Sequence, residues 1–210
     1  MKSSSSNSAP LAPPASPLVI VLSGPSGAGK DAVLSAMKTR GLALHYVVTN
    51  TTRPRRPAEV EGEPYHFISD AEFERLIAQN EMLEHALVYG RHYGVPKSQV
   101  RDALKQGKDV VIKVDVQGAM TIKKLLPDAV LAFLMPPSLD ELAKRLNGRG
   151  TEAPKDLELR LSTARSEIEK LREFDYVVTN HSQHIDRAVE DVAAIITAEK
   201  LRVAPRKYEL

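Results

Sequence analysis

The sequence predicts an α/β fold around a parallel sheet, and three features of the chain carry this prediction. Short β-branched apolar runs alternate with longer segments of helical periodicity over most of the 210 residues. The first run, Leu18–Gly24, ends in a glycine-rich turn that leads into a helix. Runs that are apolar at nearly every position are typical of strands buried on both faces of a parallel sheet. We therefore expect strand–helix–strand units with right-handed crossovers.

The predicted elements follow one another in a regular order. After the first strand we expect a helix at Lys30–Arg40, with Val33, Leu34 and Met37 on its inner face. Further strands are predicted at Leu44–Val48, Asp109–Val114, Ala129–Met135 and Tyr176–Thr179. Further helices are predicted at Gln117–Leu126, Ser138–Asn147, Pro154–Arg172 and Ser182–Val203.

Two segments interrupt this alternation. Residues 51–93 carry short polar strand candidates around one helix, Asp70–Gln79, which indicates a small mixed lobe inserted into the core. Residues 147–155 are rich in glycine and charge between two helices, which is typical of a mobile lid. We expect one domain over residues 18–205, with a core of 18–48 and 96–205, a lobe of about 49–95 and a lid of about 146–160. Residues 1–17, rich in Ser, Pro and Ala, are expected to form a disordered tail.

Composition excludes several classes of protein. The chain has no cysteine, which excludes disulfides and thiolate metal sites and fits a reducing compartment, so we expect a cytoplasmic protein. The net charge is only +2, from 29 basic and 27 acidic residues, which argues against a general nucleic-acid binder. No apolar run approaches the roughly 18 residues that a membrane span needs, so we expect no membrane segment.

Residues 24–31, GPSGAGKD, match the phosphate-binding pattern G-x-x-x-x-G-K and lie between a predicted strand and helix. Glycines let successive backbone N–H groups point at phosphate oxygens, the helix N-terminus adds positive potential, and the lysine reaches the β- and γ-phosphates. The pattern predicts an ATP site on a three-layer fold of the P-loop NTPase type. The predicted ATP ligands of the loop are Gly24, Pro25, Ser26, Gly27, Ala28, Gly29, Lys30 and Asp31.

Residues 49–67, TNTTRPRRPAEVEGEPYHF, resemble the guanylate kinase family closely. The matching residues are Thr51, Thr52, Arg53, Arg56, Glu59, Gly62, Tyr65 and Phe67. The resemblance continues through residues 80–96, VDVQG at 114–118 and RLNGRGTE at 145–152, and so extends from Leu18 to Arg202. It implies a lobe that binds GMP, a helical lid, and the reaction ATP + GMP = ADP + GDP by direct in-line transfer with Mg²⁺, in purine nucleotide metabolism.

The resemblance also implies an acceptor site. Arg53 and Arg56 offer planar guanidinium forks that can clamp a monophosphate, and Tyr65 and Tyr93 can donate hydroxyl hydrogen bonds to it. By resemblance these four residues bind the GMP phosphate. Glu84 reads guanine, because a carboxylate accepts from the paired donors N1–H and N2–H₂. The remaining residues assigned to the GMP site are Thr49, Glu59, Val95 and Asp115.

Arginines gather in and beside the predicted lid. Phosphoryl transfer spreads negative charge over the transferred group, and arginines brought in by closure stabilise it. By resemblance, Arg145, Arg149 and Arg160 serve this purpose and Asn180 lies near the adenine. The residues predicted to be catalytic are Lys30, Arg53, Arg149 and Arg160, and Arg145 and Asn180 are assigned to the ATP site.

Thr49 stands where a serine often does in the family and keeps the hydroxyl, and the chain departs from the family more clearly at three other places. Asp31 replaces the usual Ser or Thr after the loop lysine, Lys113 replaces a common acidic residue, and Val95 replaces a Ser or Thr that usually bonds the base. Because residues 113 and 115 alternate on one predicted strand, we expect both to face the phosphates. We hypothesise that Asp31 and Lys113 are coupled, the lysine offsetting the charge of the carboxylate; alternatively, Lys113 touches a phosphate directly. Asp31 and Asp115 are the predicted Mg²⁺ ligands, directly or through water.

Two alternative functions remain open. A kinase acting on ribose 1,5-bisphosphate also carries Asp after the loop lysine, but it would not need the segment from Thr49 to Tyr93. A non-catalytic guanylate-kinase-like binding module would have lost the ATP loop, whereas this chain keeps Gly24, Gly29 and Lys30. The expected ligands are therefore ATP and GMP, with dGMP as a further acceptor; the sequence does not determine the oligomeric state.

Overall fold

The computed structural model of the protein describes residues 16–57, 59–88, 90–147 and 154–210. All but the end of the tail predicted for residues 1–17 lies outside the described residues. The core is a five-stranded sheet in the order β10-β9-β1-β8-β2, and every neighbouring pair is parallel. Its strands are β1 (Val19–Ser23), β2 (Leu44–Tyr46), β8 (Asp109–Lys113), β9 (Val130–Met135) and β10 (Tyr176–Thr179). The predicted α/β class with a parallel central sheet is therefore confirmed.

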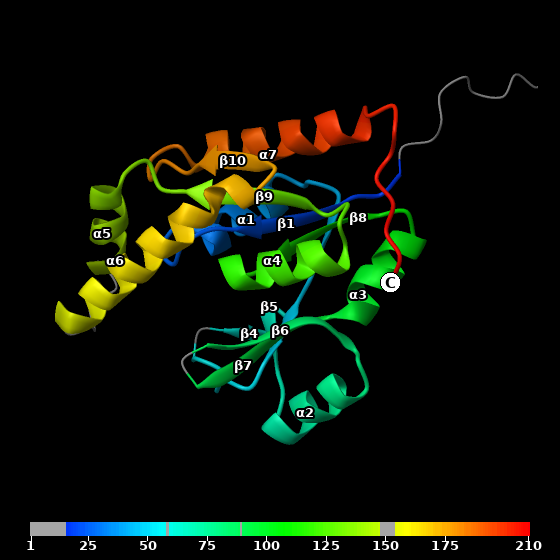
Figure 1. The fold of residues 1–210 in the computed structure, drawn as a ribbon, viewed down its shortest axis with the longest axis horizontal. Coiled ribbons are helices and arrows are strands. Elements are labelled where there is room, and N and C mark those ends of the chain that lie inside the picture. Colours follow the sequence, from blue (N-terminus) through cyan, green and yellow to red (C-terminus); the bar gives the residue numbers. More distant parts are fainter. Residues whose placement is uncertain (1–15, 58, 89, 148–153) are drawn as a thin grey trace, which may run out of the picture.

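Helices cover both faces of this sheet and make three layers (Figure 1). On one face, α1 (Lys30–Thr39) and α7 (Ile185–Lys200) bury Val33 and Val189 against Leu22 and Val111. On the other face lie α3 (Lys97–Lys105) and α4 (Val116–Leu125).

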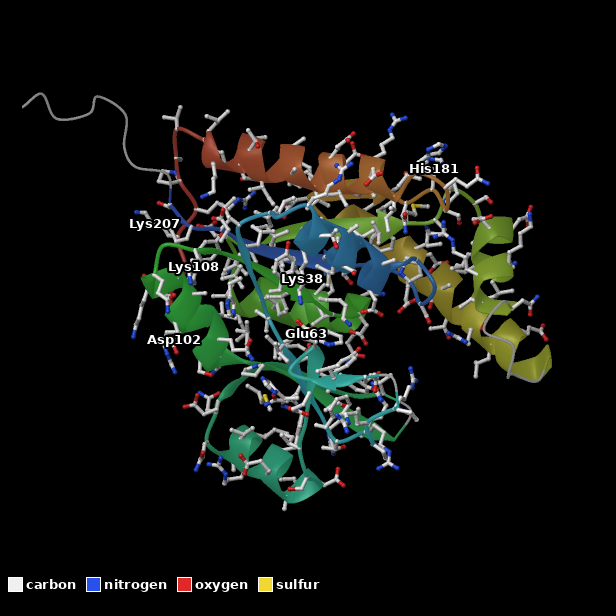
Figure 2. All side chains as sticks on the ribbon, turned by 180° about the vertical axis from the view of Figure 1, so that it is seen from behind. Lys38, Glu63, Asp102, Lys108, His181 and Lys207 are labelled. Carbon is white, nitrogen blue, oxygen red and sulfur yellow. The ribbon has the colours of Figure 1, made fainter. Side chains whose placement is uncertain are left out.

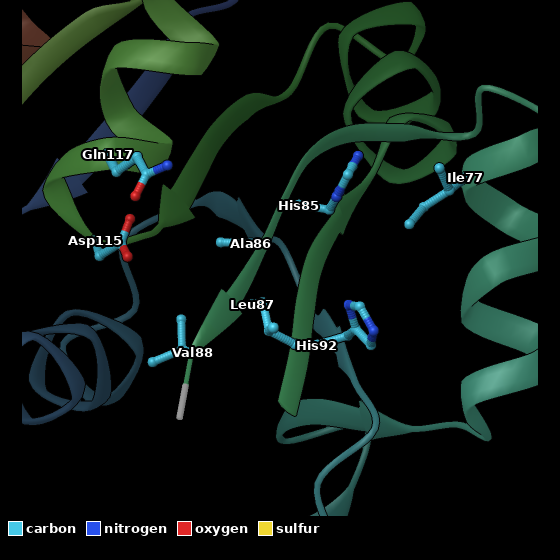
Figure 3. Close-up of a pocket in the computed structure, with 8 residues that line it drawn as sticks. All are labelled: Ile77, His85, Ala86, Leu87, Val88, His92, Asp115 and Gln117. Carbon is cyan, nitrogen blue, oxygen red and sulfur yellow. The ribbon is translucent and has the colours of Figure 1, made fainter. Parts of the chain in front are cut away.

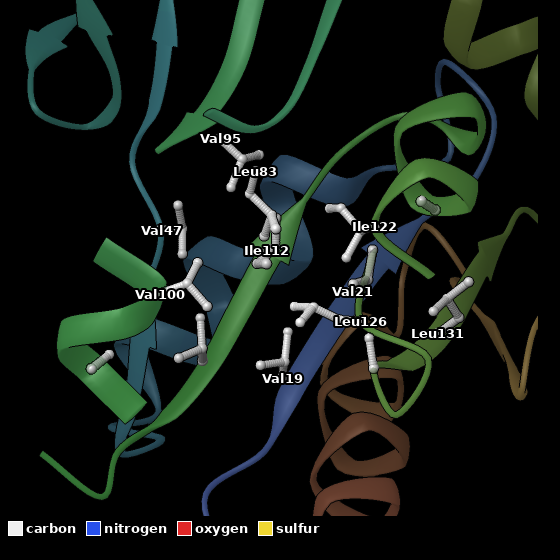
Figure 4. Close-up of a cluster of buried hydrophobic side chains, with 14 residues drawn as sticks. Val19, Val21, Val47, Leu83, Val95, Val100, Ile112, Ile122, Leu126 and Leu131 are labelled. Atoms are coloured by element: carbon white, nitrogen blue, oxygen red, sulfur yellow. The ribbon is translucent and has the colours of Figure 1, made fainter. Parts of the chain in front are cut away.

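The second face is held by a cluster that includes Val19, Val21, Ile112 and Ile122 (Figure 4). Val19 and Val21 point to this cluster while Leu22 points to the other, as expected for a strand buried on both faces. The three-layer core is therefore a direct consequence of the continuous apolar runs in the sequence.

Helix α3 has no counterpart among the predicted elements. Its buried positions are Val100 and Ala103, with Leu104 partly buried, and the rest of its nine residues are mostly polar. This short i, i+3, i+4 pattern is the signal that could have identified it. The helix predicted from Ser182 begins at Ile185, and the helix predicted to Arg172 ends as α6 (Pro154–Glu169) followed by a short 3₁₀ turn.

A second, mixed sheet occupies residues 49–96 and lies below the core in Figure 1. Its order is β4-β5-β3-β7-β6, with antiparallel β3–β7 and β6–β7 pairs and parallel β3–β5 and β4–β5 pairs. The strands are β3 (Thr49–Thr51), β4 (Val60–Glu61), β5 (Pro64–Phe67), β6 (Met82–Val88) and β7 (Arg91–Pro96). Helix α2 (Asp70–Ala78) buries Phe73, whose ring stacks on His92 at 5.0 Å. That this part acts as a separate lobe stays a prediction.

The predicted lid is only partly described. Helix α5 (Leu139–Asn147) packs Leu142 and Leu146 against Ala164 of α6. Residues 148–153, including Arg149, lie outside the described residues. Among the helices that the structure describes, none is both long and apolar enough to cross a bilayer.

A C-terminal segment, residues 201–210, folds back along the core. Arg206 makes two hydrogen bonds of 2.7 Å to Glu199, which is 3% exposed and also accepts from the Tyr176 hydroxyl. Lys207 N and the Tyr208 hydroxyl bond Asp128. Figure 2 shows Lys207 at the end of the molecule where Lys108 lies, opposite His181. The segment thus closes the end of the core that is remote from His181.

Removing the Arg206 guanidinium should destabilise the fold. The hydrogen bonds from Arg206 lower the pKa of Glu199 to about 2, so this stabilisation is present above its ordinary value near 4.5 and is lost as the pH falls through about 2. We expect R206A to lower the free energy of unfolding by about 2–3 kcal/mol at pH 7, because it leaves a buried carboxylate short of its partner. Denaturant titration measures this change. R202A is the matched control, since Arg202 is 49% exposed and 3.7 Å from the same carboxylate, and its effect should stay within about 0.5 kcal/mol. Equal losses in the two variants would contradict the prediction.

Candidate functional site

The turn between β1 and α1 is shaped by glycines that no other residue could replace. Gly24 and Gly29 have φ values of +139° and +93°. A Cβ at Gly24 would lie 2.1 Å from the Leu134 carbonyl oxygen, and one at Gly29 would lie 2.3 Å from Asn180 Nδ2. The backbone therefore fits closely against β9 and against the end of β10, and α1 begins directly after the turn. This is the geometry of an anion-binding loop at a helix N-terminus.

Lys30 folds back over this loop. Its Nζ donates to the carbonyl oxygens of Gly24, at 2.6 Å, and Pro25, at 3.2 Å. Burial lowers the pKa of Lys30 to about 8; the negative charge of Glu167 acts in the opposite direction, and the positive charge of Lys113 lowers it further. An ammonium group that has lost most of its water gains strongly from an anion placed beside it.

The far side of the loop is tied to Arg145 and Asn180. Arg145 donates to the carbonyl oxygens of Ala28, at 3.2 Å, and Asn180, at 2.8 Å, and Asn180 Nδ2 donates to Ala28 at 2.8 Å. Arg160 Nη2 donates to the Ser26 hydroxyl at 3.0 Å, from helix α6. The predicted donor-site residues thus lie together, except for Arg149, which lies outside the described residues.

Three residues that contribute to this region were not identified from the sequence. The Ser182 hydroxyl accepts from Arg145 at 2.9 Å and donates to Glu141, so both residues help to fix Arg145. The position of Ser182, two residues after Asn180, is the only sequence signal for it. Glu167 on α6 has a buried oxygen, Oε2, with no hydrogen-bond partner among the described residues, and no local pattern marks it.

Arg53 and its neighbours form a second cationic cluster on the mixed sheet. Arg53 makes two 2.7 Å hydrogen bonds to Glu59, which also accepts from the Arg56 backbone at 2.9 Å. Hydrogen bonding from Arg53 lowers the pKa of Glu59 to about 2. The Arg53 guanidinium lies 5.2 Å from the centre of the Tyr65 ring, and the rings of Tyr65 and Tyr93 are 5.9 Å apart. Glu59 therefore positions the arginine in addition to occupying part of its fork.

Glu84 is a buried carboxylate at the junction of the two sheets. It is 6% exposed, and burial, together with the charge of Asp115, raises its pKa from about 4.5 to about 7. Gly118 makes room for it: a Cβ there would lie 3.0 Å from both Cδ and Oε1 of Glu84. Such a carboxylate suits a ligand that offers two neighbouring N–H donors.

Two residues lie elsewhere than the sequence led us to expect. The expectation that Lys113 and Asp115 share one strand was wrong, because β8 ends at Lys113 and Asp115 is the N-cap of α4. Its Oδ1 accepts from Gly118 N at 2.7 Å, a standard capping bond. Val95 is fully buried in the cluster of Figure 4, beside Leu83, so its side chain presents no surface to a base. Thr49 is buried at the start of β3.

A hollow of about 470 Å³ lies beside Asp115. Figure 3 shows Asp115 and Gln117 on one side of β6 and Ile77 of α2 on the other. Apart from Asp115, none of its lining residues belongs to the predicted site. The hollow therefore does not coincide with the predicted acceptor site and shares only Asp115 with it.

The two cationic clusters meet at Lys113. Its Nζ lies 2.5 Å from Asp31 Oδ1, at the start of α1, and 3.0 Å from the Tyr65 hydroxyl, on β5. The predicted proximity of Asp31 and Lys113 is therefore present. The described residues contain no group of three His, Cys, Asp or Glu side chains arranged to hold a metal ion.

Comparison with known proteins gives a consistent result. The family model described as guanylate kinase matches residues 16–199. The chain is 45% identical over 205 residues to the rice (Oryza sativa subsp. japonica) protein named guanylate kinase 2, chloroplastic/mitochondrial, covering 97% of this chain and 72% of that one. It is 44% identical over 187 residues to guanylate kinase of Lactobacillus johnsonii, covering 89% and 91% of the two chains. The crystal structure of guanylate kinase from Anaplasma phagocytophilum superposes with a TM-score of 0.74 at 30% identity, covering 90% of this chain and 89% of that one.

Proposed function

Because the chain belongs to the guanylate kinase family, we propose that it transfers the γ-phosphoryl group of ATP to GMP, giving ADP and GDP. One observation of the site carries this proposal. A single residue, Lys113, contacts Tyr65 of the second cluster at 3.0 Å and Asp31 of the donor loop at 2.5 Å. This bridge supports the proposal, because direct transfer requires the donor and acceptor phosphates to lie side by side.

The donor is held by the glycine-rich loop. Backbone N–H groups of residues 26–31 surround the phosphates, and Lys30 turns from the loop carbonyls toward the β- and γ-oxygens. Arg145 and Asn180 line the nucleoside side, and Arg160 and Arg149 neutralise the transferred group. Arg160 already reaches the loop through Ser26, which supports this role.

The acceptor is held at both ends. Arg53, Arg56, Tyr65 and Tyr93 bind the phosphate of GMP, and Glu84 accepts from guanine N1–H and N2–H₂. Glu59 keeps the Arg53 fork oriented over Tyr65. With both nucleotides fixed, the attacking phosphate oxygen and the γ-phosphorus are aligned, and charge that develops on the transferred group meets preorganised cations. Because these residues read only phosphate and base, dGMP is a second acceptor.

Mg²⁺ is the proposed partner of ATP, and it would neutralise the phosphates during transfer. Asp31 and Asp115 fit such an ion, since Mg²⁺ takes hard oxygen ligands and keeps several waters when bound to phosphate. The charges of both carboxylates raise the pKa of Lys30, so both lie near the cradle. Asp31, with its side chain 69% exposed, can reach a water shell without leaving the loop.

An ADP-release assay with ATP and Mg²⁺ tests the function. GMP, dGMP, AMP, UMP and ribose 1,5-bisphosphate are offered separately. We expect turnover with the two guanine nucleotides at rates well above the others. Turnover only with ribose 1,5-bisphosphate would favour a kinase of that sugar, the alternative that Asp31 suggests. No turnover with any acceptor would favour a non-catalytic binding module.

GMP binding should depend on pH through Glu84. Only the ionised carboxylate can accept both guanine donors, and with a pKa of about 7 the ionised fraction falls about tenfold from pH 8 to pH 6. We therefore expect the Kd for GMP to be about tenfold weaker at pH 6 than at pH 8, measured by titration calorimetry without ATP. The phosphate of GMP also titrates near 6, so E84Q, which retains only that contribution, is the control. Identical pH profiles in both proteins would contradict the assignment.

The compartment also remains a proposal. A chain without cysteine suits the reducing cytoplasm. The relatives do not narrow this choice, because the rice protein's name refers to chloroplast and mitochondrion. Fluorescence microscopy of the tagged full-length protein in its native cell tests it.

A further inference from the structure

Lys113 occupies a position between the two phosphate sites. It is the last residue of β8, at the carboxyl edge of the core sheet, and its side chain is 11% exposed. Its Nζ contacts Asp31 Oδ1 of the donor loop at 2.5 Å and the Tyr65 hydroxyl of the acceptor cluster at 3.0 Å. The same Nζ lies 4.6 Å from the centre of the Tyr65 ring. One ammonium group is therefore bonded to both sites.

The two partners of Lys113 are held very differently. The Lys113 side chain is 11% exposed, so little water can reach its ammonium group. Asp31 is 69% exposed. Bonds to an exposed carboxylate contribute little, because water replaces them readily. Asp31 can therefore turn away at small cost, whereas a buried lysine then needs another anion.

Tyr65 indicates where that anion would lie. Its oxygen accepts from Lys113, so its own O–H is left to donate. The Arg53 guanidinium lies beside the same tyrosine, 5.2 Å from the centre of the Tyr65 ring and 5.3 Å from the centre of the Phe67 ring. A phosphate that accepts from the Tyr65 hydroxyl is then within reach of Lys113 as well as Arg53.

We propose that Lys113 is a direct ligand of the acceptor phosphate. In the absence of that phosphate, Asp31 is the counter-ion of the Lys113 ammonium, and the phosphate then displaces the Asp31 carboxylate. The inference rests on the proposed function and adds to it a substrate-binding residue at the position where the chain departs from its family. It also explains why Asp31 and Lys113 occur together. The aspartate is the counter-ion that the largely buried Lys113 ammonium requires when no phosphate is bound.

The proposal has two consequences of opposite sign. Removing the ammonium takes a charged hydrogen bond from the phosphate, worth about 10-fold to 100-fold in affinity. Removing Asp31 takes away the competing anion, so GMP should bind more tightly. The second effect exists only while Lys113 is present, so the two substitutions are not additive.

Titration calorimetry with GMP, without ATP or Mg²⁺, tests both consequences. We expect K113M to weaken GMP binding at least about 10-fold and D31A to strengthen it about 3-fold or more, and we expect D31A to change binding less than about 2-fold in the K113M background. K113R should retain most of the affinity. K124M makes the same chemical change at an exposed site of α4 and should leave the Kd unaltered.

Each outcome decides between the possibilities. Unchanged GMP binding in K113M, or the same D31A effect with and without Lys113, would overturn the inference. Should K113M fail to fold in a thermal melt, the substitution D31A at an exposed site still tests the proposal. Weaker or equal GMP binding in D31A would contradict the role of Asp31 as a counter-ion that the phosphate displaces. A wild-type protein that binds no GMP would overturn the proposed function itself and this inference with it.

Discussion

Substituting Met for Lys30 is expected to lower kcat at least about 10³-fold. Lys30 donates hydrogen bonds to the carbonyl oxygens of Gly24 and Pro25 and is partly buried beside the loop, so its ammonium is positioned before any nucleotide arrives. In the transition state its charge acts on the donor oxygens in surroundings that exclude water, where electrostatic stabilisation is largest. Met keeps the length and apolar stem of the side chain and removes only the charge.

Pre-steady-state measurement of ADP formation with saturating ATP and GMP would separate this effect from weaker binding. K38M is the matched control, because Lys38 lies on the same helix (Figure 2) and its side chain is exposed. Its kcat should stay within about twofold of the wild type, since its ammonium lies 5.2 Å from the centre of the Tyr46 ring, an exposed contact of small energy. Residual K30M turnover within about tenfold of the wild type would mean that the loop binds ATP without assisting transfer.

The donor loop could be predicted from sequence because its requirements are local. Gly24, Gly29 and Lys30 lie within seven residues, and each is fixed by backbone geometry that few residues satisfy. The same holds for the three inner strands β1, β8 and β9, whose apolar runs are buried on both faces. The proximity of Asp31 and Lys113 was predictable for another reason: two departures from a family pattern compensated each other in charge.

What the sequence did not predict depends on contacts across the fold. Gly118 and Glu84 are 34 residues apart, and nothing local indicates that one makes room for the other. Asp115 follows the strand by two positions and could have extended it, but the capping bond to Gly118 N ends β8 earlier. Val95 follows a glycine at which α2 packs closely, since a Cβ at Gly94 would lie 2.9 Å from Phe73. That packing turns the next side chain into the core.

E84Q should reduce kcat/KM for GMP by about 10²-fold or more and should also narrow the preference for GMP over AMP. An ionised carboxylate accepts two charge-assisted hydrogen bonds, each worth about 1.5–3 kcal/mol. The amide keeps one acceptor but turns an N–H toward a guanine donor, so one favourable bond becomes a repulsion. The substitution is nearly isosteric, and Gly118 leaves room for either group.

Kinetics with AMP, whose base is adenine, distinguish a loss of guanine recognition in E84Q from general damage to the protein. Its base edge offers one acceptor and one donor, which an amide can pair with but a carboxylate cannot. Steady-state kinetics with GMP and AMP on E84Q should therefore show opposite changes, a loss for GMP and a gain for AMP. E81Q is the matched control, because the same change is made three residues earlier, where the carboxylate is 43% exposed and 3.8 Å from Arg101. Parallel losses with both nucleotides would mean that Glu84 supports the fold at this junction, and the choice of guanine would then have to come from elsewhere in the cleft.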